Sequence, residues 1–275
     1  MSRIITAVVV LPVLIASILV SWLQPLFVLL AAAAMVLGLY EFWILAKRRE
    51  MNPDVTTGYL AAAGLFTVFY FTDPKTGLDA EGLLLILLIF IASVLVTFTF
   101  RGAPFEKMIA SSGTTILGVL YVVLLGGHLV AVRNGFDQTL SAHLLSFFFL
   151  VLMGSDTGAY YVGRAFGKHK LAPSISPGKT WEGVVGGLMA SLLMATVAHY
   201  WFFRDLPLKW ALPLAAAMTV VGIFGDLAES ALKRGAGAKD AANILPGHGG
   251  LLDRLDSLLF NAPVIYYFGR FYFVG

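Results

Sequence analysis

The sequence lacks cysteine altogether and has few charged residues for its length. None of its 275 residues is Cys, which excludes disulfide bonds and cysteine-ligated zinc. Only 13% of the residues are charged, against about 25% in a soluble domain, and 59% are hydrophobic. The net charge of +3 is too small to indicate nucleic-acid binding. The composition therefore predicts an all-α integral membrane protein, a polytopic bundle with most of its surface in lipid.

Long apolar runs divide the chain into about nine predicted transmembrane helices, each of about 20 residues or slightly fewer. The runs cover residues 4–22, 26–46, 58–72, 82–100, 109–132, 142–163, 183–203, 210–228 and 257–274. The first run has no small-residue cleavage site after it, so it is interpreted as a retained helix and not as a signal peptide. No soluble domain or linker interrupts the series. We expect one polytopic membrane domain over residues 1–275, with N-terminal helices at 1–135 and a C-terminal half at 136–275 that carries the chemistry.

The basic residues indicate how these helices are oriented. With the N-terminus in the cytoplasm, 14 of the 19 Lys and Arg residues fall on the cytoplasmic side and 5 on the other. This is the asymmetry that the positive-inside rule describes. It places the two charged loops, residues 164–182 and 229–256, on the cytoplasmic side, where nucleotides are found.

The charges concentrate between Gly225 and Asp256, which hold five of the 16 acidic residues. Asp226, Glu229, Ser230 and Lys233 have the offsets 0, 3, 4 and 7, so on a helix they form one polar stripe. Charge next to a membrane span is costly and indicates a functional site. The alternative is an ordinary helix end with solvated charges.

The rest of this segment adds groups suited to phosphate. Lys239 lies in a Gly-rich turn, where the backbone can approach an anion closely, and His248 has glycine on both sides. Asp253 and Asp256 share a helix face and, opposite Asp226, make an oxygen-rich site for Mg²⁺. The alternative is that both carboxylates form structural ion pairs with Arg254 or Lys233.

A second charged segment, residues 155–183, reads SDTGAYYVGRAFGKHKLAPSISPGKTWEG. Asp156 follows an apolar run, and a basic cluster follows it. Pro177 and Gly178 predict a turn, and Lys179 and Thr180 precede the next span. Lys179 is a candidate phosphate ligand, whereas Lys168 and Lys170 could serve topology alone. Glu41 lies inside a span and is interpreted as a buried polar contact.

Residues 230–257, SALKRGAGAKDAANILPGHGGLLDRLDS, resemble the signature of the phosphatidate cytidylyltransferases, also called CDP-diacylglycerol synthases. The signature positions are filled by Ser230, Lys233, Arg234, Lys239, Asp240, Pro246, His248, Gly249, Gly250, Asp253, Arg254 and Asp256. Residues 155–183 also look like the conserved loop that precedes the signature in that family. The resemblance is detailed only in the C-terminal half, and the N-terminal half carries no usable motif.

The resemblance implies transfer of CMP from CTP to phosphatidate, giving CDP-diacylglycerol and diphosphate, with Mg²⁺ alone or with a second cation. It implies a homodimer in the bacterial cytoplasmic (inner) membrane, with the active site facing the cytoplasm. Asp226 and Asp253 would bind the metal. The catalytic residues would be Lys233, Lys239, Asp240, His248 and Asp256. Substrate contacts would come from Asp156, Lys168, Lys179, Thr180, Ser230, Arg234, Gly249, Gly250 and Arg254.

Two other classes of function fit parts of the sequence. A transporter could also have nine spans, but its charged residues should lie near the membrane midplane and on both sides. In this sequence they gather on one side, which argues against a transporter. A cytidylyltransferase for a different lipid phosphate is the stronger of these alternatives, because nothing in the sequence reads the acyl chains or backbone of the lipid. A CTP-dependent assay with phosphatidate separates these possibilities.

Overall fold

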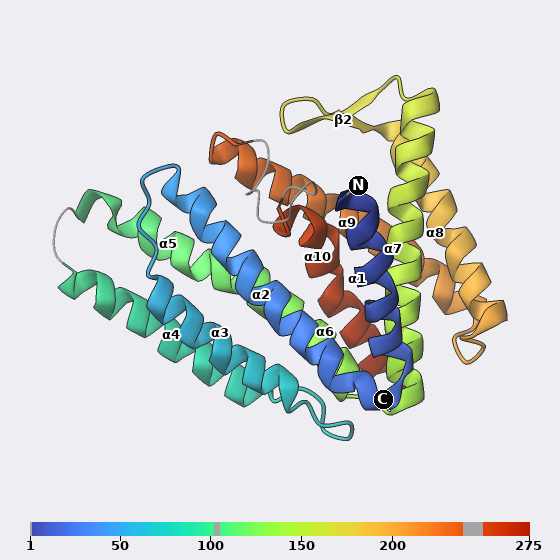
Figure 1. Ribbon diagram of the computed structural model, residues 1–275, viewed down its shortest axis with the longest axis horizontal. Helices are drawn as coiled ribbons and strands as arrows, with labels where there is room; N and C mark the ends of the chain where they lie inside the picture. The colour runs from blue at the N-terminus through green and yellow to red at the C-terminus, as the bar shows by residue number, and fades with distance from the viewer. Residues whose placement is uncertain (1, 102–104, 239–249) are drawn as a thin grey trace.

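The computed structural model describes residues 2–101, 105–238 and 250–275, with side chains from Val10 onward. It is an all-α bundle with one small hairpin (Figure 1). The α-helices are α1 (Ser2–Leu19), α2 (Gln24–Lys47), α3 (Val55–Tyr70), α4 (Ala80–Phe100), α5 (Met108–Gly118), α6 (Leu125–Asn134), α7 (Gln138–Phe166), α8 (Trp181–Trp201), α9 (Leu208–Gly235) and α10 (Leu252–Gly269). Short 3₁₀-helices at Ser21–Leu23 and Phe105–Lys107 precede α2 and α5.

Two π-helical segments complete the backbone. Residues Val119–Leu124 (η3) join α5 and α6 into one continuous helix, and Arg270–Val274 (η4) extends α10. Within the described ranges the ten α-helices therefore make nine continuous helical segments, one at the place of each predicted span. The predicted all-α polytopic fold is confirmed.

Six of these helical segments are long and apolar enough to cross a membrane. They are residues Ser21–Lys47, Ala80–Phe100, Phe105–Asn134, Gln138–Phe166, Trp181–Trp201 and Leu208–Gly235. Such helices form because every backbone N–H and C=O must find its partner inside the segment when no water is available. Helix α3 is shorter, as the run at 58–72 indicated, and α10 carries Asp253, Arg254 and Asp256 in its first turns.

Polar residues at the ends of the helices fix where several of them begin. The side chains of Asp54, Asp79 and Asp137 accept hydrogen bonds from backbone N–H groups in the first turns of α3, α4 and α7. Thr180 does the same for α8, accepting from the N–H of Gly183 at 3.1 Å. These caps satisfy donors that have no partner within the helix.

The hairpin between α7 and α8 was not predicted. Strands β1 (Lys170–Ala172) and β2 (Ser176–Thr180) pair antiparallel, and the turn falls at residues 173–175. The predicted turn at Pro177 and Gly178 is therefore wrong, because both residues lie inside β2. Pro is tolerated at the edge of so small a sheet, since its missing N–H need not face a partner strand.

Helices α7 and α8 lie side by side and approach through small residues (Figure 1). A Cβ atom added to Gly158 of α7 would lie 2.5 Å from Cβ of Ala190 and 2.6 Å from the carbonyl oxygen of Gly186. One added to Gly186 of α8 would lie 2.4 Å from Cβ of Val162. Small residues at such crossings let helix backbones touch, which is a common way of packing helices in lipid.

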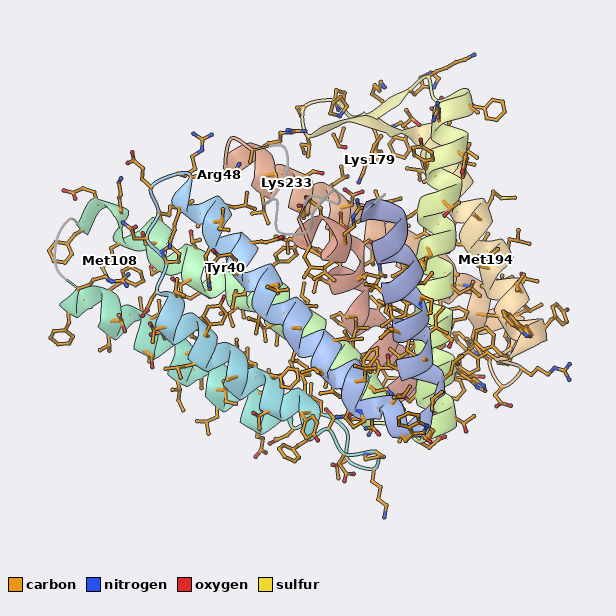
Figure 2. The ribbon with its side chains drawn as sticks, viewed as in Figure 1. Tyr40, Arg48, Met108, Lys179, Met194 and Lys233 are labelled. Atoms are coloured by element: carbon orange, nitrogen blue, oxygen red, sulfur yellow. The ribbon has the colours of Figure 1, made fainter. Side chains whose placement is uncertain are left out.

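Several basic side chains gather at the end of the bundle that carries the hairpin. Arg48 at the end of α2, Lys179 on β2 and Lys233 near the end of α9 all lie there (Figure 2). The ends of α9 and α10 that flank residues 239–249 lie at the same end. The two charged segments of the sequence are therefore brought together, although they are separated along the chain by α8 and most of α9.

Candidate active site

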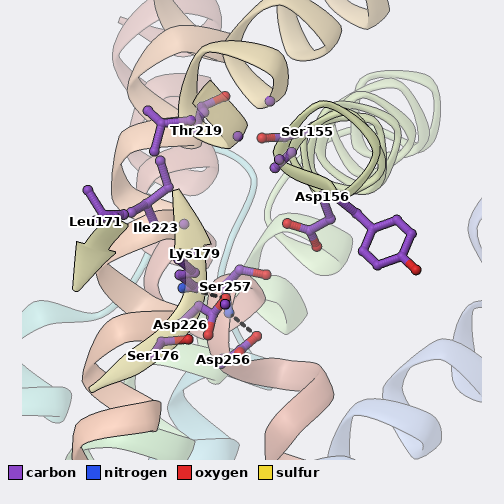
Figure 3. A pocket seen from close by; sticks show the side chains of 18 of the residues that line it. Ser155, Asp156, Leu171, Ser176, Lys179, Thr219, Ile223, Asp226, Asp256 and Ser257 are labelled. Carbon is purple, nitrogen blue, oxygen red and sulfur yellow. Dashed lines mark hydrogen bonds and ion pairs between the residues drawn. The ribbon is translucent and has the colours of Figure 1, made fainter. Parts of the chain in front are cut away.

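A cavity of about 580 Å³ lies between α7, α8, α9, α10 and the hairpin (Figure 3). Its walls are apolar toward the bundle interior, with Leu152, Met218 and Ile223, and polar toward the hairpin end. The charged residues that line it are Asp156, Arg164, Lys179, Asp226, Asp253, Arg254 and Asp256. Six of these seven were predicted site residues. The seventh, Arg164, belongs to the basic cluster that follows Asp156 in the sequence, which also contains Lys168, His169 and Lys170.

Lys179 and Asp226 form the ion pair that links the hairpin to α9. Lys179 Nζ lies 2.5 Å from Asp226 Oδ2. An ammonium has three N–H donors, so this one contact leaves donors that no other described side chain accepts. The other oxygen of Asp226 is 3.4 Å from the Ser230 hydroxyl, which donates weakly to it. Lys179 is thus held in place by charge while its donors stay available for another oxygen.

Lys233 links α9 to α10 through two carboxylates. Its Nζ lies 2.7 Å from Glu229 Oε2 on the same helix and donates to Asp253 Oδ1 at 2.6 Å. The Glu229 side chain is only 1% exposed, against 14% for Lys233 and 15% for Asp253. Glu229, Ser230 and Lys233 of the stripe predicted on α9 therefore face the protein interior. The Asp226 side chain is 39% exposed. Part of the alternative interpretation also holds, since Asp253 does pair with Lys233.

Three carboxylates point into the same space with a single paired lysine. Asp156 on α7 and Asp256 on α10 both interact electrostatically with Asp226 and with Lys179 (Figure 3). Asp256 Oδ1 also accepts a hydrogen bond from the N–H of Ser257 at 2.6 Å. Over the whole cavity lining, four carboxylates and three cations give a formal charge of minus one. Clustered carboxylates of this kind offer the oxygen ligands that a divalent cation prefers.

The donor set fits Mg²⁺ in chemistry. Carboxylate oxygens are its preferred protein ligands, and it usually takes only one or two of them and completes its shell with water and phosphate oxygens. Among the described residues no three His, Asp or Glu side chains gather closely enough to hold an ion by themselves. The predicted ligands, Asp226 and Asp253, each lie in an ion pair with lysine. The arrangement suits a metal that shares its coordination with a phosphate substrate.

Other predicted site residues are engaged in holding the local structure. The Thr180 hydroxyl caps α8 and is buried, although Thr180 also lines the cavity. Arg234 donates to the carbonyl oxygens of Ile175 and Ala238, which ties the end of α9 to the hairpin turn. The N–H of Gly250 donates to Asp253 Oδ2 at 3.1 Å. These hydrogen bonds hold the hairpin and the ends of α8, α9 and α10 in place around the cavity.

Lys168 does not line the cavity. Its side chain is exposed, and its backbone N–H donates to Glu182 at 3.1 Å. The same carboxylate binds the ring of His169 through Nδ1 at 2.6 Å, so Glu182 fixes the base of the hairpin. Lys239, Asp240, His248 and Gly249 were also predicted site residues, and they lie outside the described residues.

Sequence reasoning missed the hydroxyl groups that line the cavity: Ser155, Tyr160, Ser176, Thr219 and Ser257. Hydroxyl residues are common in transmembrane helices, where they often bond to their own backbone, so type alone did not single them out. Thr219 lies seven residues before Asp226, about two helical turns, so both share one face of α9. That offset was the available signal for Thr219, whereas Ser155 is the neighbour of Asp156 in the chain and has no such signal.

Comparison with known proteins agrees with this site. Residues 1–272 match the model of a family described as the cytidylyltransferase family. A protein of Bacillus subtilis named phosphatidate cytidylyltransferase is 34% identical over 251 residues, which cover 88% of this chain and 87% of the relative. Proteins of the same name from Haemophilus influenzae and Staphylococcus saprophyticus are 44% identical over 134 residues and 48% identical over 123 residues. Those two matches cover 47% and 45% of this chain and 46% and 47% of the relatives. The chain belongs to the cytidylyltransferase family.

Proposed function

We propose that the protein is a phosphatidate cytidylyltransferase, which converts CTP and phosphatidate into CDP-diacylglycerol and diphosphate in a magnesium-dependent reaction. The observation that carries this proposal is that one cavity is lined by four carboxylates and by Lys179. The carboxylates are Asp156, Asp226, Asp253 and Asp256. The cavity belongs to a chain of the cytidylyltransferase family, and its relatives are named for this reaction.

The position of the cavity suits one substrate dissolved in water and one anchored in lipid. It lies at the charged end of a bundle whose helices are apolar along most of their length. Its apolar residues, such as Leu152 and Met218, extend from the carboxylates into the bundle. A lipid phosphate could therefore reach the carboxylates while its glycerol and acyl groups stay in an apolar environment. The volume falls in the usual range for small-molecule sites, roughly 300–1,000 Å³.

The reaction needs positioning and charge neutralisation more than a strong base. A phosphate oxygen of phosphatidate, already ionised, forms a bond to the α-phosphorus of CTP. The bond from that phosphorus to the bridging oxygen of the β-phosphate breaks, and diphosphate leaves with the electron pair. Lys179 would donate to phosphate oxygens in this transition state, because its pair with Asp226 leaves further N–H donors of the ammonium without an acceptor. Lys233 would hold Asp253 in place through their hydrogen bond.

A bound Mg²⁺ would neutralise charge on the triphosphate and orient its oxygens. We propose Asp226 and Asp253 as the residues that hold it, with Asp256 assisting. Asp156 and Asp256 would add negative charge near the ion, since both interact with Asp226. The roles of Lys239, Asp240, His248 and Gly249 stay predictions.

The wider setting is part of the same proposal. We expect the C-terminal half, residues 136–275, to carry catalysis, because the elements that line the cavity, α7 to α10 with the hairpin, all belong to it. The excess of basic residues at one end supports a site that faces the cytoplasm, in the inner membrane of a bacterium. The homodimer that the family resemblance implies also stays a prediction.

The direct test is an assay of purified protein in detergent with CTP, Mg²⁺ and phosphatidate, following diphosphate and lipid product together. The wild type should form CDP-diacylglycerol, and Asp226→Asn should lose at least about a hundredfold in kcat, the scale seen when a group that stabilises a transition-state charge is removed. Asp137→Asn is the matched control. Asp137 caps α7 at the opposite end of the bundle, and Asn caps equally well.

Two results would count against the proposal. A well-folded wild type that turns over a different lipid phosphate, but not phosphatidate, would move the assignment to another substrate of the same chemistry. Equal activity of Asp226→Asn and Asp137→Asn would remove Asp226 from the site. Omission of Mg²⁺ should abolish turnover, and activity that persists in the presence of a chelator would contradict the metal dependence.

A further inference from the structure

Helix α2 and the turn after it belong to the half of the sequence without a motif, yet they contact the end of α9 and the start of α10. Glu41, near the C-terminal end of α2, is 0% exposed. Its Oε1 accepts a hydrogen bond from the N–H of Leu251 at 2.8 Å, and its Oε2 accepts from the N–H of Leu252 at 2.7 Å. These are the first backbone donors of α10. A residue 210 positions away in the sequence therefore caps the helix that carries Asp253 and Asp256.

A side chain in the turn just after α2 contacts the end of α9. Arg49 Nε donates to the carbonyl oxygen of Gly235, the last residue of α9, at 2.7 Å. The chain leaves α9 at Gly237, whose φ of +68° is a conformation that favours glycine. A Cβ atom at Gly237 would also lie 3.3 Å from the Arg49 guanidinium. The guanidinium is thus packed over the point where α9 ends.

The two charges match the two helix ends they touch. The N-terminus of a helix carries partial positive charge, and its C-terminus carries partial negative charge. The Glu41 carboxylate lies at the N-terminus of α10, and the Arg49 guanidinium lies at the C-terminus of α9. Glu41 lies on α2 and Arg49 lies in the turn that directly follows it, so this end of α2 fixes the relative position of the two helix ends. Those ends carry Lys233 on α9 and Asp253 on α10, which are joined at 2.6 Å.

The first turn of α10 shows why this matters for Asp253. Three successive N–H groups, those of Gly250, Leu251 and Leu252, all donate to carboxylates. Glu41 takes two of them and Asp253 takes one. If Glu41 could no longer accept, the neighbouring Asp253 carboxylate would be drawn toward the freed donors and away from Lys233, because buried N–H groups without a partner are costly.

We propose that Glu41 and Arg49 are positioning residues for catalysis, which hold the ends of α9 and α10 at the spacing that keeps Asp253 on Lys233 and in the cavity. This inference rests on the proposed function for its activity measurements. Displacing a catalytic group by about 1 Å can cost about a hundredfold in rate. Neither residue touches the cavity, so loss of either should lower kcat and leave the binding of CTP nearly unchanged.

The main test compares two buried carboxylates at helix starts. Glu41→Gln and Asp54→Asn each replace a carboxylate by an uncharged amide of the same size, and only the first touches α10, since Asp54 caps α3. Glu41→Gln should lower kcat about tenfold or more, with the KM for CTP within about threefold of wild type. Hydrogen exchange of the backbone amides at residues 250–258 should become faster. Asp54→Asn should change neither quantity.

Arg49→Gln provides a second test at an exposed position, where misfolding is not expected. Its matched control is Arg48→Gln, the adjacent exposed arginine at the end of the same helix. Arg49→Gln should lower kcat about threefold, less than Glu41→Gln, because an exposed charge at a helix end contributes less than a buried one. It should also speed hydrogen exchange at Gly237 and Ala238, whereas Arg48→Gln should not.

Several outcomes would overturn the positioning role. For Glu41→Gln, a kcat within twofold of that for Asp54→Asn would overturn it. A change in the KM for CTP alone, or unchanged hydrogen exchange of the amides at residues 250–258, would do the same. If Glu41→Gln does not fold, equal kcat for Arg49→Gln and Arg48→Gln would overturn it. A wild type that makes no product from phosphatidate would instead contradict the proposed function. The exchange measurements would then still test whether α2 holds the two helix ends.

Discussion

Replacement of Lys233 by methionine tests the ion pairs that join α9 to α10. Methionine keeps most of the length and apolar volume of the lysine stem and removes only its charge. Glu229 and Asp253 would then face each other without a cation, and Glu229 is almost completely buried. Removing one partner of a buried ion pair typically costs about 3–5 kcal/mol. Because Asp253 borders the cavity and can gain some solvent, we expect about 3 kcal/mol, the lower end of that range.

The measurement is the free energy of unfolding in mixed detergent micelles, followed by circular dichroism. Lys107→Met is the matched control, because the ion pair between Lys107 and Glu50 has side-chain exposures of 47% and 82%. Surface pairs of this kind contribute little, so the control should unfold like the wild type. Adding Glu229→Gln to Lys233→Met should restore most of the lost stability, since one buried charge disappears. A loss below about 1 kcal/mol for Lys233→Met would refute the idea that these charges are effectively desolvated.

Three further changes test other parts of the structure. Gly158→Val should destabilise the protein by about 1–3 kcal/mol, because its side chain would meet Ala190 and the backbone of α8; an unchanged unfolding midpoint would contradict the close α7–α8 packing. Lys179→Gln should lower kcat/KM by about a hundredfold or more, since it removes the cation beside Asp226, and phosphatidate turnover within tenfold of wild type would exclude a role in the transition state. Tyr121→Phe should raise stability by about 1 kcal/mol, because within the described residues the buried Tyr121 hydroxyl has no hydrogen-bond partner, and a clear loss of stability would show that the hydroxyl is bonded.

The fold could be predicted from the sequence because its signal is local. Each span is a run of apolar residues, and the requirement for internal hydrogen bonding in lipid leaves the helix as the natural structure for such a run. The polar stripe at Asp226, Glu229, Ser230 and Lys233 followed from the same kind of signal, because residues three and four apart share a helix face. The predicted placement of Glu229 and Lys233 on one face of α9 is confirmed, because Lys233 pairs with Glu229 on that helix and also with Asp253.

The contacts between distant elements could not be predicted in the same way. Periodicity places Glu41 inside a span and indicates that it is buried, but it does not say that its partner is the first turn of α10. The hairpin was missed for a related reason, since strands of three and five residues are too short to show an alternating pattern. Its turn lies at residues 173–175, and not at Pro177 and Gly178, because Ala172 pairs with Ser176.

The close contact of α7 with α8 also bears on the order in which the protein assembles during synthesis. These helices are neighbours in the chain, joined only by the short hairpin, and they meet through backbone at Gly158 and Gly186. Their interface can form as soon as α8 has entered the bilayer, without waiting for later segments. The opposite wall of the cavity needs the first and last parts of the chain together, since α10 is capped by Glu41. Half of the cavity is therefore built from a local unit, and the other half is completed only when translation of the last helix ends.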